Sequence, residues 1–389
     1  MTKEMTDERK IAWLTLALIP ELGSRSLWKL YQAMGSPEAI IRASEKELLD
    51  KASIKPRTAR AIAGKQTIRN PKEEWERLVD RGISFITWDD EAYPAPLRHI
   101  PDPPLFLFAK GSYRPAHTVA LAIVGTRNAS VRGILFAEKL ASDLAALGIT
   151  VVSGLAIGID SAAHRGALKA GGQTIAVMGS GLDVPYPRAN RDLIELIAGS
   201  GVVFSEYPLG TPPEKWRFPM RNRIVSGLSM GVVVVEAGIK SGALITARMA
   251  LDQGREVFAV PGGVSDERYA GTNKLIKDGA KLVEDIKDIL EEYPFLHTLP
   301  RSEMKIEKRP LAIKGDEHRT SRSDDNNRGT AESAESRILQ VLSGEPQHID
   351  RICERTGFSC GTVLSILTML ELKGLVRQLP GKYFISERR

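Results

Sequence analysis

The sequence predicts an α/β protein built on a doubly wound, mostly parallel sheet, with a small all-α domain before it and a winged helix after it. Three observations predict this class. Short amphipathic stretches fill residues 10–70. From about residue 119, apolar or β-branched runs alternate with helical patterns, which is typical of a parallel sheet covered on both faces. Residues 334–386 show three helical patterns followed by two strand-like runs.

The charge distribution limits how the protein could bind a polyanion. A chain of 389 residues has room for two or three domains of about 150 residues, and its formal net charge is +6. Residues 71–295 nevertheless hold 25 basic and 27 acidic side chains. Any nucleic-acid binding in this region must therefore come from a local cluster of cations.

Cysteine content and hydropathy indicate a cytoplasmic protein. Two cysteines, Cys353 and Cys360, are too few for a secreted disulfide framework or a four-ligand zinc site. The first ten residues are polar, and no apolar run approaches the roughly 18 residues of a membrane span. We expect neither export nor membrane insertion, and no cofactor.

The first domain, residues 1–70, is predicted to be helical. Residues 11–19 have apolar side chains at helical spacing, and Pro20-Glu21-Leu22-Gly23-Ser24 forms a turn before the next helix. The turn is similar to that of a helix-hairpin-helix, whose backbone N–H groups can face a phosphate. An ordinary helical packing unit is the simpler interpretation because the pattern is short.

The second domain, residues 71–295, is predicted to carry the sheet and a ligand-binding rim. We expect its strands at 119–124, 150–153, 174–178, 202–205, 231–236 and 256–260. Each run is followed by glycine, serine or a charged residue. In doubly wound sheets the ligand lies outside the carboxyl ends of the strands, so these six turns form the candidate site.

The remaining residues are predicted to form a linker and a third domain. Residues 296–332 hold 8 basic and 7 acidic side chains and no aromatic residue, so we expect a disordered linker. Residues 333–389 fit a winged helix, with helices at 334–342, 349–356 and 360–372 and strands at 375–378 and 383–386. The third helix has one basic residue at its end, Lys373, so we expect this domain to serve protein contacts or to assist DNA binding only modestly.

The first turn of the rim indicates phosphate binding without a dinucleotide. Gly125-Thr126-Arg127 lacks the second and third glycines of a dinucleotide-binding loop, so NAD is not expected. Arg127 can donate to a phosphate beside the N–H groups of the following helix. Alternatively, Arg127 is paired with Asp160 or Glu206.

A second cluster on the rim combines cations with rings. Residues 185–223 contain six basic side chains, and aromatic residues are interleaved with them at Tyr186, Tyr207, Trp216 and Phe218. Grooves that bind single-stranded nucleic acid combine cations along the phosphates with rings on which bases stack. The alternative is that Arg221 and Arg223 are buried partners of Glu206 and Glu236.

Enzyme chemistry has weak support. Ser153, Asp160 and His164 lack a nucleophile elbow, and Asp160 is better explained as a helix cap with His164 as its i+4 neighbour. Pro261-Gly262-Gly263 and Gly271-Thr272-Asn273 are similar to the phosphate loop of lysine-decarboxylase-like nucleoside-monophosphate phosphoribohydrolases. Seven residues separate the two halves, however, and no catalytic Glu follows them. We predict that the protein is not an enzyme, and a nucleotide-binding enzyme of this kind is the alternative.

Five motifs carry a resemblance to a known family. They are VGTR at 124–127, SGLAIGIDSAAH at 153–164, YPRAN at 186–190, FPMRNR at 218–223 and SGALITA at 241–247. As a set, over about residues 85–290, they resemble the DprA (Smf) family. The resemblance implies an extended Rossmann-like domain that binds single-stranded DNA without sequence preference, forms a homodimer, protects incoming DNA and loads RecA recombinase onto it during natural transformation.

The resemblance also implies site residues. Arg127, Arg188 and Lys215 match the family's DNA contacts. The full set that we expect to bind DNA is Gly125, Thr126, Arg127, Ser153, Gly154, Arg188, Lys215, Arg217, Phe218, Arg221, Asn222, Arg223, Ser241 and Gly242. Ala243 departs from the family, which commonly has Ser there. The flanking domains resemble helix-hairpin-helix or sterile-alpha-motif-like domains and a winged helix.

Overall fold

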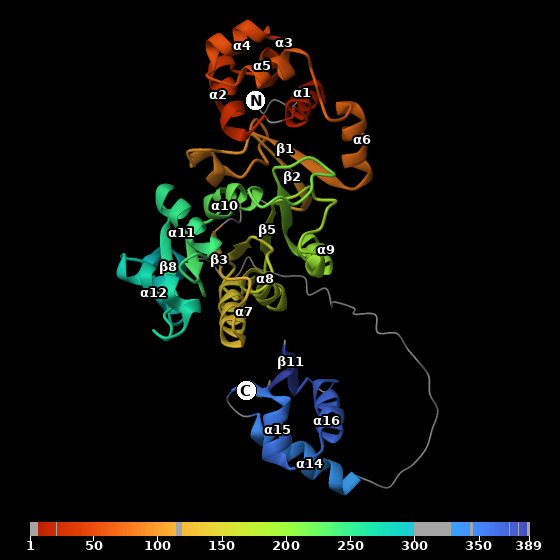
Figure 1. Cartoon of the computed structure of the whole chain (residues 1–389), viewed down its shortest axis with the longest axis vertical. Helices are drawn as coiled ribbons and strands as arrows, with labels where there is room; N and C mark the ends of the chain where they lie inside the picture. The colour runs from red at the N-terminus through yellow and green to blue at the C-terminus, as the bar shows by residue number, and fades with distance from the viewer. Residues whose placement is uncertain are drawn as a thin grey trace. The chain divides into compact units, whose positions relative to one another are not determined.

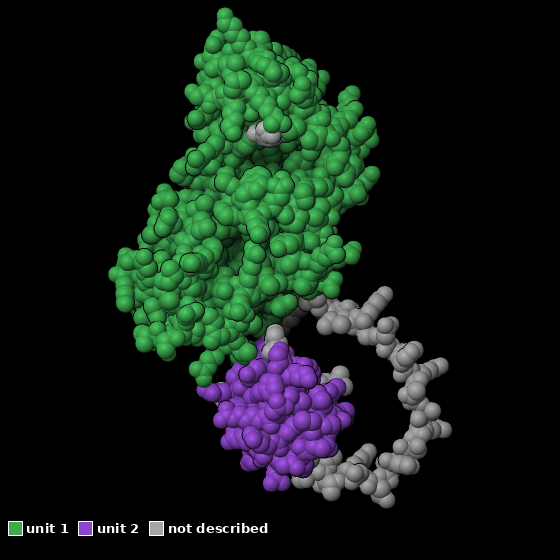
Figure 2. Space-filling model, viewed as in Figure 1, with its two compact units in different colours: residues 1–308 green, residues 309–389 purple. Residues whose placement is uncertain are grey.

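A computed structural model describes residues 7–20, 22–113, 119–298, 328–342, 345–372, 374–379 and 381–386. The chain divides into two compact units, residues 1–308 and residues 309–389 (Figure 2). Most of the expected linker, residues 299–327, lies outside the described residues. Its last residues, from Arg328, already belong to a helix of the second unit.

The first unit contains a nine-stranded sheet. Its strands are β1 (Ile83–Thr87), β2 (Phe106–Gly111), β3 (Ala120–Val124), β4 (Thr150–Ser153), β5 (Thr174–Met178), β6 (Val202–Ser205), β7 (Gly231–Val234), β8 (Glu256–Ala259) and β9 (Lys281–Leu282). Their order is β1-β2-β6-β5-β4-β3-β7-β8-β9. Pairs from β6 to β9 are parallel, whereas β2 is antiparallel to both β1 and β6. The six expected strands and the mostly parallel sheet are confirmed.

The order of the strands reverses beside β3. The chain runs from β3 through β4 and β5 to β6, then returns to place β7 on the other side of β3. The helices around this turning point are α7 (Val131–Ala146), α8 (Ile159–Lys169), α9 (Arg191–Ser200), α10 (Arg217–Gly227) and α11 (Gly242–Asp252) (Figure 1). This is the doubly wound arrangement, in which the reversal marks the usual ligand crevice.

Both faces of the parallel strands are buried, which explains their continuous apolar runs. Ala120, Ala122 and Val124 of β3 belong to one apolar cluster with α10 and α11. Leu121 and Ile123, which alternate with them, belong to another with α7 and α8. The sheet therefore holds its strand ends on a rigid, three-layered core.

Helices at the N-terminal end pack against the β1–β2 edge of the sheet (Figure 1). They are α1 (Asp7–Ala17), α2 (Ser24–Met34), α3 (Pro37–Arg42), α4 (Glu45–Lys51), α5 (Pro56–Ala63) and α6 (Pro71–Asp80). Trp13 and Leu30 share one core with Phe108 of β2 and Met178 of β5. Because this core is continuous, the expected boundary between residues 70 and 71 stays a prediction, and so does the helix-hairpin-helix interpretation.

Shorter elements complete the first unit. They are η1 (Ala95–His99), η3 (Arg188–Asn190), η4 (Glu267–Tyr269), α12 (Ala270–Lys277), α13 (Ile286–Glu292) and η5 (Pro294–Thr298). Within the described ranges, no helix has the length and apolar character needed to span a bilayer.

The second unit is a winged helix, as expected. It contains α14 (Arg328–Val341), α15 (Ile349–Thr356) and α16 (Cys360–Leu372) with β10 (Gln347–His348), β11 (Val376–Leu379) and β12 (Tyr383–Ser386). The strand order is β10-β12-β11. Helix α14 begins six residues earlier than the sequence pattern predicts, and the two-residue strand β10 was not expected.

Candidate nucleic-acid interface

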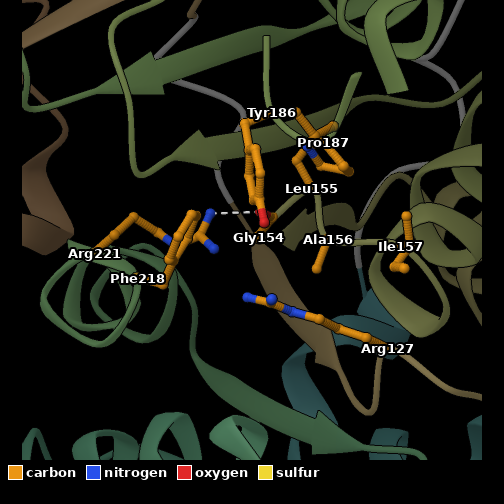
Figure 3. A pocket seen from close by; sticks show the side chains of 9 residues that line it. All are labelled: Arg127, Gly154, Leu155, Ala156, Ile157, Tyr186, Pro187, Phe218 and Arg221. Carbon is orange, nitrogen blue, oxygen red and sulfur yellow. Dashed lines mark hydrogen bonds between the residues drawn. The ribbon is translucent and has the colours of Figure 1, made fainter. Parts of the chain in front are cut away.

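A pocket lies at the carboxyl ends of β3, β4 and β5, next to α10 (Figure 3). It is lined by Arg127, Gly154, Leu155, Ala156, Ile157, Tyr186, Pro187, Phe218 and Arg221. The pocket is adjacent to the reversal of strand order, where doubly wound sheets bind their ligands.

Two glycines let the loop after β3 lie against the start of α8. A Cβ atom on Gly125 would come within 2.5 Å of Ile159, and one on Gly158 would lie 2.5 Å from the carbonyl oxygen of Thr126. Gly158 also has φ 83°, which disfavours any side chain there. The glycines therefore serve close packing, and they bring the exposed Arg127 to the mouth of the pocket.

Two rings and one cation meet in the lining of the pocket. The ring centroids of Tyr186 and Phe218 are 5.3 Å apart, with 37° between their planes. The guanidinium carbon of Arg127 lies 5.4 Å from the centroid of Phe218, and Figure 3 shows this side chain reaching toward the ring. Among the described residues, no ion pair joins Arg127 to Asp160 or Glu206, the alternative that the sequence left open.

Arg221 and Asp160 are buried under the pocket. Arg221 donates through Nη1 to the carbonyl oxygen of Gly154 at 2.5 Å. Burial lowers the pKa of Arg221 to about 10, and Asp160 opposes this shift. Burial raises the pKa of Asp160, which Arg221 opposes in turn. A Cβ atom at Gly154 would collide with both side chains, at 2.6 and 2.8 Å, so they form the floor beneath this glycine.

Asp160 is not the cap of α8, so the interpretation from the sequence was wrong on this point. Gly158 is the N-cap of α8, and Asp160, in the first turn, accepts a hydrogen bond from the N–H of Ala156 at 3.3 Å. His164 instead lies 2.7 Å from the hydroxyl of Thr174. Asp160 thus closes the loop before its helix, and His164 belongs to the core.

Arg223 has the structural role that the sequence analysis offered as an alternative. Its Nη2 donates to both carboxyl oxygens of Glu206, at 2.6 and 2.9 Å, and its Nε lies 3.6 Å from Asp102. Only 4% of Arg223 is exposed. Glu236, the other expected partner, bonds elsewhere. The guanidinium of Arg223 therefore does not reach the surface of the rim.

Three cations on the rim stay exposed. Arg127 follows β3, Arg188 lies in η3 after Tyr186, and Lys215 precedes α10. In the part of the chain that the structure describes, none of them forms an ion pair. They are the expected site residues whose charge is available to a phosphate.

The other expected site residues have partners within the protein. The hydroxyl of Ser153 is buried and donates to the carbonyl oxygen of Ile123 at 2.6 Å. Asn222 accepts from Nε of Arg221 at 3.3 Å. Ser241 is the N-cap of α11, and it lies with the exposed Gly242 after β7, outside the pocket lining. Thr126 donates its N–H to the carbonyl of Glu236 at 2.7 Å.

Sequence reasoning missed the apolar wall of the pocket. Leu155, Ala156 and Ile157 line it, and 45% of Ile157 is exposed. The signal was available, because three apolar residues between Gly154 and Gly158 are unusual in a surface turn. The sequence pattern offers Tyr186 only as one of several rings, whereas its contact with Phe218 makes it part of the wall.

The acidic side chain of Glu236 forms a separate buried cluster. It accepts from the N–H of Ser130 at 2.8 Å and from the hydroxyls of Ser130 and Tyr269, the latter at 2.8 Å. Ser130 is the N-cap of α7, so Glu236 takes the position at a helix N-terminus that favours an anion. Glu236 is fully buried.

The loop that is similar to a phosphate loop is also bonded internally. The amide of Asn273 accepts from the N–H of Gly262 at 3.2 Å and donates to its carbonyl at 3.0 Å. Within the described residues, no group of three or more His, Cys, Asp or Glu side chains could hold a metal ion.

Two family models match the chain. The model described as DNA recombination-mediator protein A matches residues 84–294, and the DprA winged helix domain matches residues 323–382. Protein Smf from Synechocystis is 34% identical over 97% of this chain and 98% of its own. Protein Smf from Escherichia coli is 40% identical over 77% of this chain and 76% of its own.

A solved structure agrees with these matches. The X-ray structure of DNA processing protein A (DprA) from Streptococcus pneumoniae covers 75% of this chain and 99% of its own, with a TM-score of 0.65 and 35% sequence identity.

Proposed function

The chain belongs to the DprA (Smf) family of DNA recombination mediators, and we propose that it binds single-stranded DNA without sequence preference through the rim of its parallel sheet. One observation carries the proposal. The exposed Arg127 lies 5.4 Å from the ring of Phe218, which contacts the ring of Tyr186, and the exposed Arg188 and Lys215 are two and three residues away from these rings in the chain.

This arrangement suits a single strand. Cations that neutralise phosphates supply affinity without reading sequence. Rings stack on any base because every base has a π-face, provided that the base is not already stacked in a duplex. Residues 71–295 carry slightly more acidic than basic side chains, so binding rests on this cluster and not on bulk charge.

The remaining expected residues are proposed to contribute from the surface of the rim or from the buried layer beneath it. Gly125 and Thr126 shape the loop that holds Arg127, Gly154 leaves room for the side chains of Arg221 and Asp160, and Phe218 offers its ring. Arg221 and Arg223 are proposed to maintain the rim from below, as is Ser153. Ser241 and Gly242 extend the rim at the end of β7.

Family membership supports the wider role. We propose that the protein is cytoplasmic, forms a homodimer, protects incoming DNA and loads RecA recombinase onto it during natural transformation. The related nucleotide-hydrolysing activity is not proposed, because Asn273 and Gly262 of the similar loop bond each other.

Electrophoretic mobility shifts with single-stranded, double-stranded and ribo-oligonucleotides test the proposal. Wild type should prefer the single DNA strand. The triple variant Arg127→Ala, Arg188→Ala, Lys215→Ala should bind more weakly, and the magnitude of its log–log salt slope should fall by about 2, since each lost contact removes about 0.7.

A matched control removes the same number of positive charges from residues outside the rim. Lys139, Arg165 and Lys287 are exposed on α7, α8 and α13, and their triple alanine variant should retain wild-type affinity and slope. An equal loss in both triple variants would show that only net charge matters and would refute the assignment of the rim.

A further inference from the structure

We propose that Trp216 is a second platform on which a base of single-stranded DNA stacks, and that Arg217 holds it in position. The inference rests on the proposed function and adds a residue to the same rim. Trp216 lies directly after Lys215 and two residues before Phe218, and 57% of it is exposed. Exposure of one apolar side chain is ordinary by itself. Trp216 differs from such a side chain because two contacts hold its exposed ring in place.

Two contacts hold the indole of Trp216, one at the edge of the ring and one on its face. Its Nε1–H donates to the carboxyl group of Glu214. The guanidinium carbon of Arg217 lies 4.9 Å from the ring centroid, within the range of a cation–π contact. An exposed ring that is already immobilised loses little conformational freedom when a base stacks on it.

Arg217 is in turn fixed by groups of the protein. Its Nη1 donates to the carbonyl of Pro212, and its Nη2 lies 3.4 Å from the carboxyl of Glu214. Its guanidinium carbon also lies 5.2 Å from the ring centroid of Tyr207. The guanidinium thus contacts the rings of Trp216 and Tyr207, and 13% of its side chain is exposed. These contacts assign Arg217 to positioning Trp216 and leave the phosphate contact to Lys215.

The order of residues matches a strand running along the rim. The Cα atoms of Trp216 and Phe218 are at most about 7.6 Å apart, because consecutive Cα atoms are separated by about 3.8 Å. Residues two positions apart at the start of a helix do not face the same side. The two rings are therefore neighbouring but separate surfaces, with the cation of Lys215 beside them. Alternation of cations and rings is the pattern of a single-strand groove.

The test compares an oligodeoxythymidine with an abasic strand of the same length, which keeps the phosphates and lacks the bases. Trp216→Ala should weaken binding of the oligodeoxythymidine about tenfold, within the range that stacking supplies per base. The salt slope should stay unchanged, since no phosphate contact is lost. Trp216→Phe should restore most of the affinity. On the abasic strand, wild type and Trp216→Ala should bind equally.

Two further variants separate the roles. Phe295→Ala removes an aromatic side chain of similar exposure, 50%, from η5, and should change nothing. Arg217→Ala should weaken binding of the oligodeoxythymidine without lowering the salt slope, and its effect should not add to that of Trp216→Ala. Lys215→Ala, in contrast, should lower the slope by about 0.7.

The outcomes distinguish this inference from the function on which it rests. If wild type fails to bind either strand, the proposed function is overturned. If wild type binds and Trp216→Ala binds as tightly, or loses equal affinity for both strands, only the stacking role is overturned. Loss of binding to a protein partner with DNA affinity intact would also overturn it. A slope lowered by Arg217→Ala would return Arg217 to the phosphate contacts.

Discussion

Lowering the pH from 8 to 5 should destabilise the first unit through one buried histidine. His164 on α8 is fully buried, and its Nδ1 lies 2.7 Å from Oγ1 of Thr174. That hydroxyl donates its single proton to the carbonyl of Val151 at 2.7 Å, so it must accept from Nδ1–H. Nε2 is then an unprotonated acceptor, and it is buried without a hydrogen-bond partner. The folded protein therefore holds a neutral imidazole.

The size of the effect follows from the two pKa values. Burial, together with the nearby cations Arg221 and Arg165, lowers the pKa of His164 to about 3. In the unfolded chain the pKa is about 6.5. Below pH 6.5 the imidazole binds a proton in the unfolded state but not in the folded state. The contribution of His164 to the free energy of unfolding is therefore fully present above pH 6.5 and is lost as the pH drops toward 3. At pH 5 the loss in unfolding free energy is about 2 kcal/mol.

Urea unfolding at pH 8 and pH 5, followed by tryptophan fluorescence, measures the loss. All five tryptophans belong to the first unit, so the signal reports its unfolding. His164→Leu should lose about 2 kcal/mol less than wild type between the two pH values. His99→Leu, at an exposed histidine, should behave like wild type. Burial raises the pKa values of Asp160 and Glu206, so these two carboxyl groups stabilise the folded state as the pH falls, opposite to His164. Their contributions are the same in wild type and variant and cancel in the comparison.

An absolute destabilisation by His164→Leu does not bear on this reasoning, since the leucine also changes packing. Identical pH dependence in wild type and His164→Leu would refute it.

Three other predictions follow from the same structure. Gly158→Ala should lower the free energy of unfolding by at least about 2 kcal/mol in a denaturant titration, because the residue has φ 83° and its Cβ would meet the Thr126 carbonyl. Gly263→Ala, at a glycine in open space, should leave the free energy of unfolding nearly unchanged. Arg221→Met should cost about 3 kcal/mol by leaving Asp160 buried without its cation, and adding Asp160→Asn should recover part of the loss; equal stability of the single and double variants would contradict this coupling. A chain that ends at residue 298 should keep its single-strand affinity within about tenfold in fluorescence polarisation, and a larger loss would assign DNA contacts to the winged helix.

The parallel strands could be predicted because burial on both faces makes each of them a continuous apolar run. Strands β1 and β2 escaped the pattern, since they pair antiparallel and only the short η1, and no α-helix, lies between them. Strands β9 and β10 have two residues each, too few to show any period.

For the candidate interface, the sequence could predict the region of the fold but not which side chains contact one another. Arg188 and Arg223 are the same residue type near the same rim, yet one is exposed and the other is buried against Glu206 and Asp102. Asp102 precedes Arg223 by more than a hundred residues, so only the folded chain brings the two together. Ser153 likewise depends on strand register, which turns its hydroxyl toward Ile123.

The acidic side chain at the N-terminus of α7 bears on competition with the free nucleotides of a cell. Glu236 is tied to the chain, so its effective concentration beside the N–H of Ser130 far exceeds that of a dissolved phosphate compound. A mononucleotide would have to replace three hydrogen bonds that the protein already makes. The proposed function leaves phosphates to the exposed cations of the rim, and we expect each cation to hold a single phosphate weakly. A polymer would engage several of them at once and a monomer only one, so we expect strands to be selected over nucleotides by avidity.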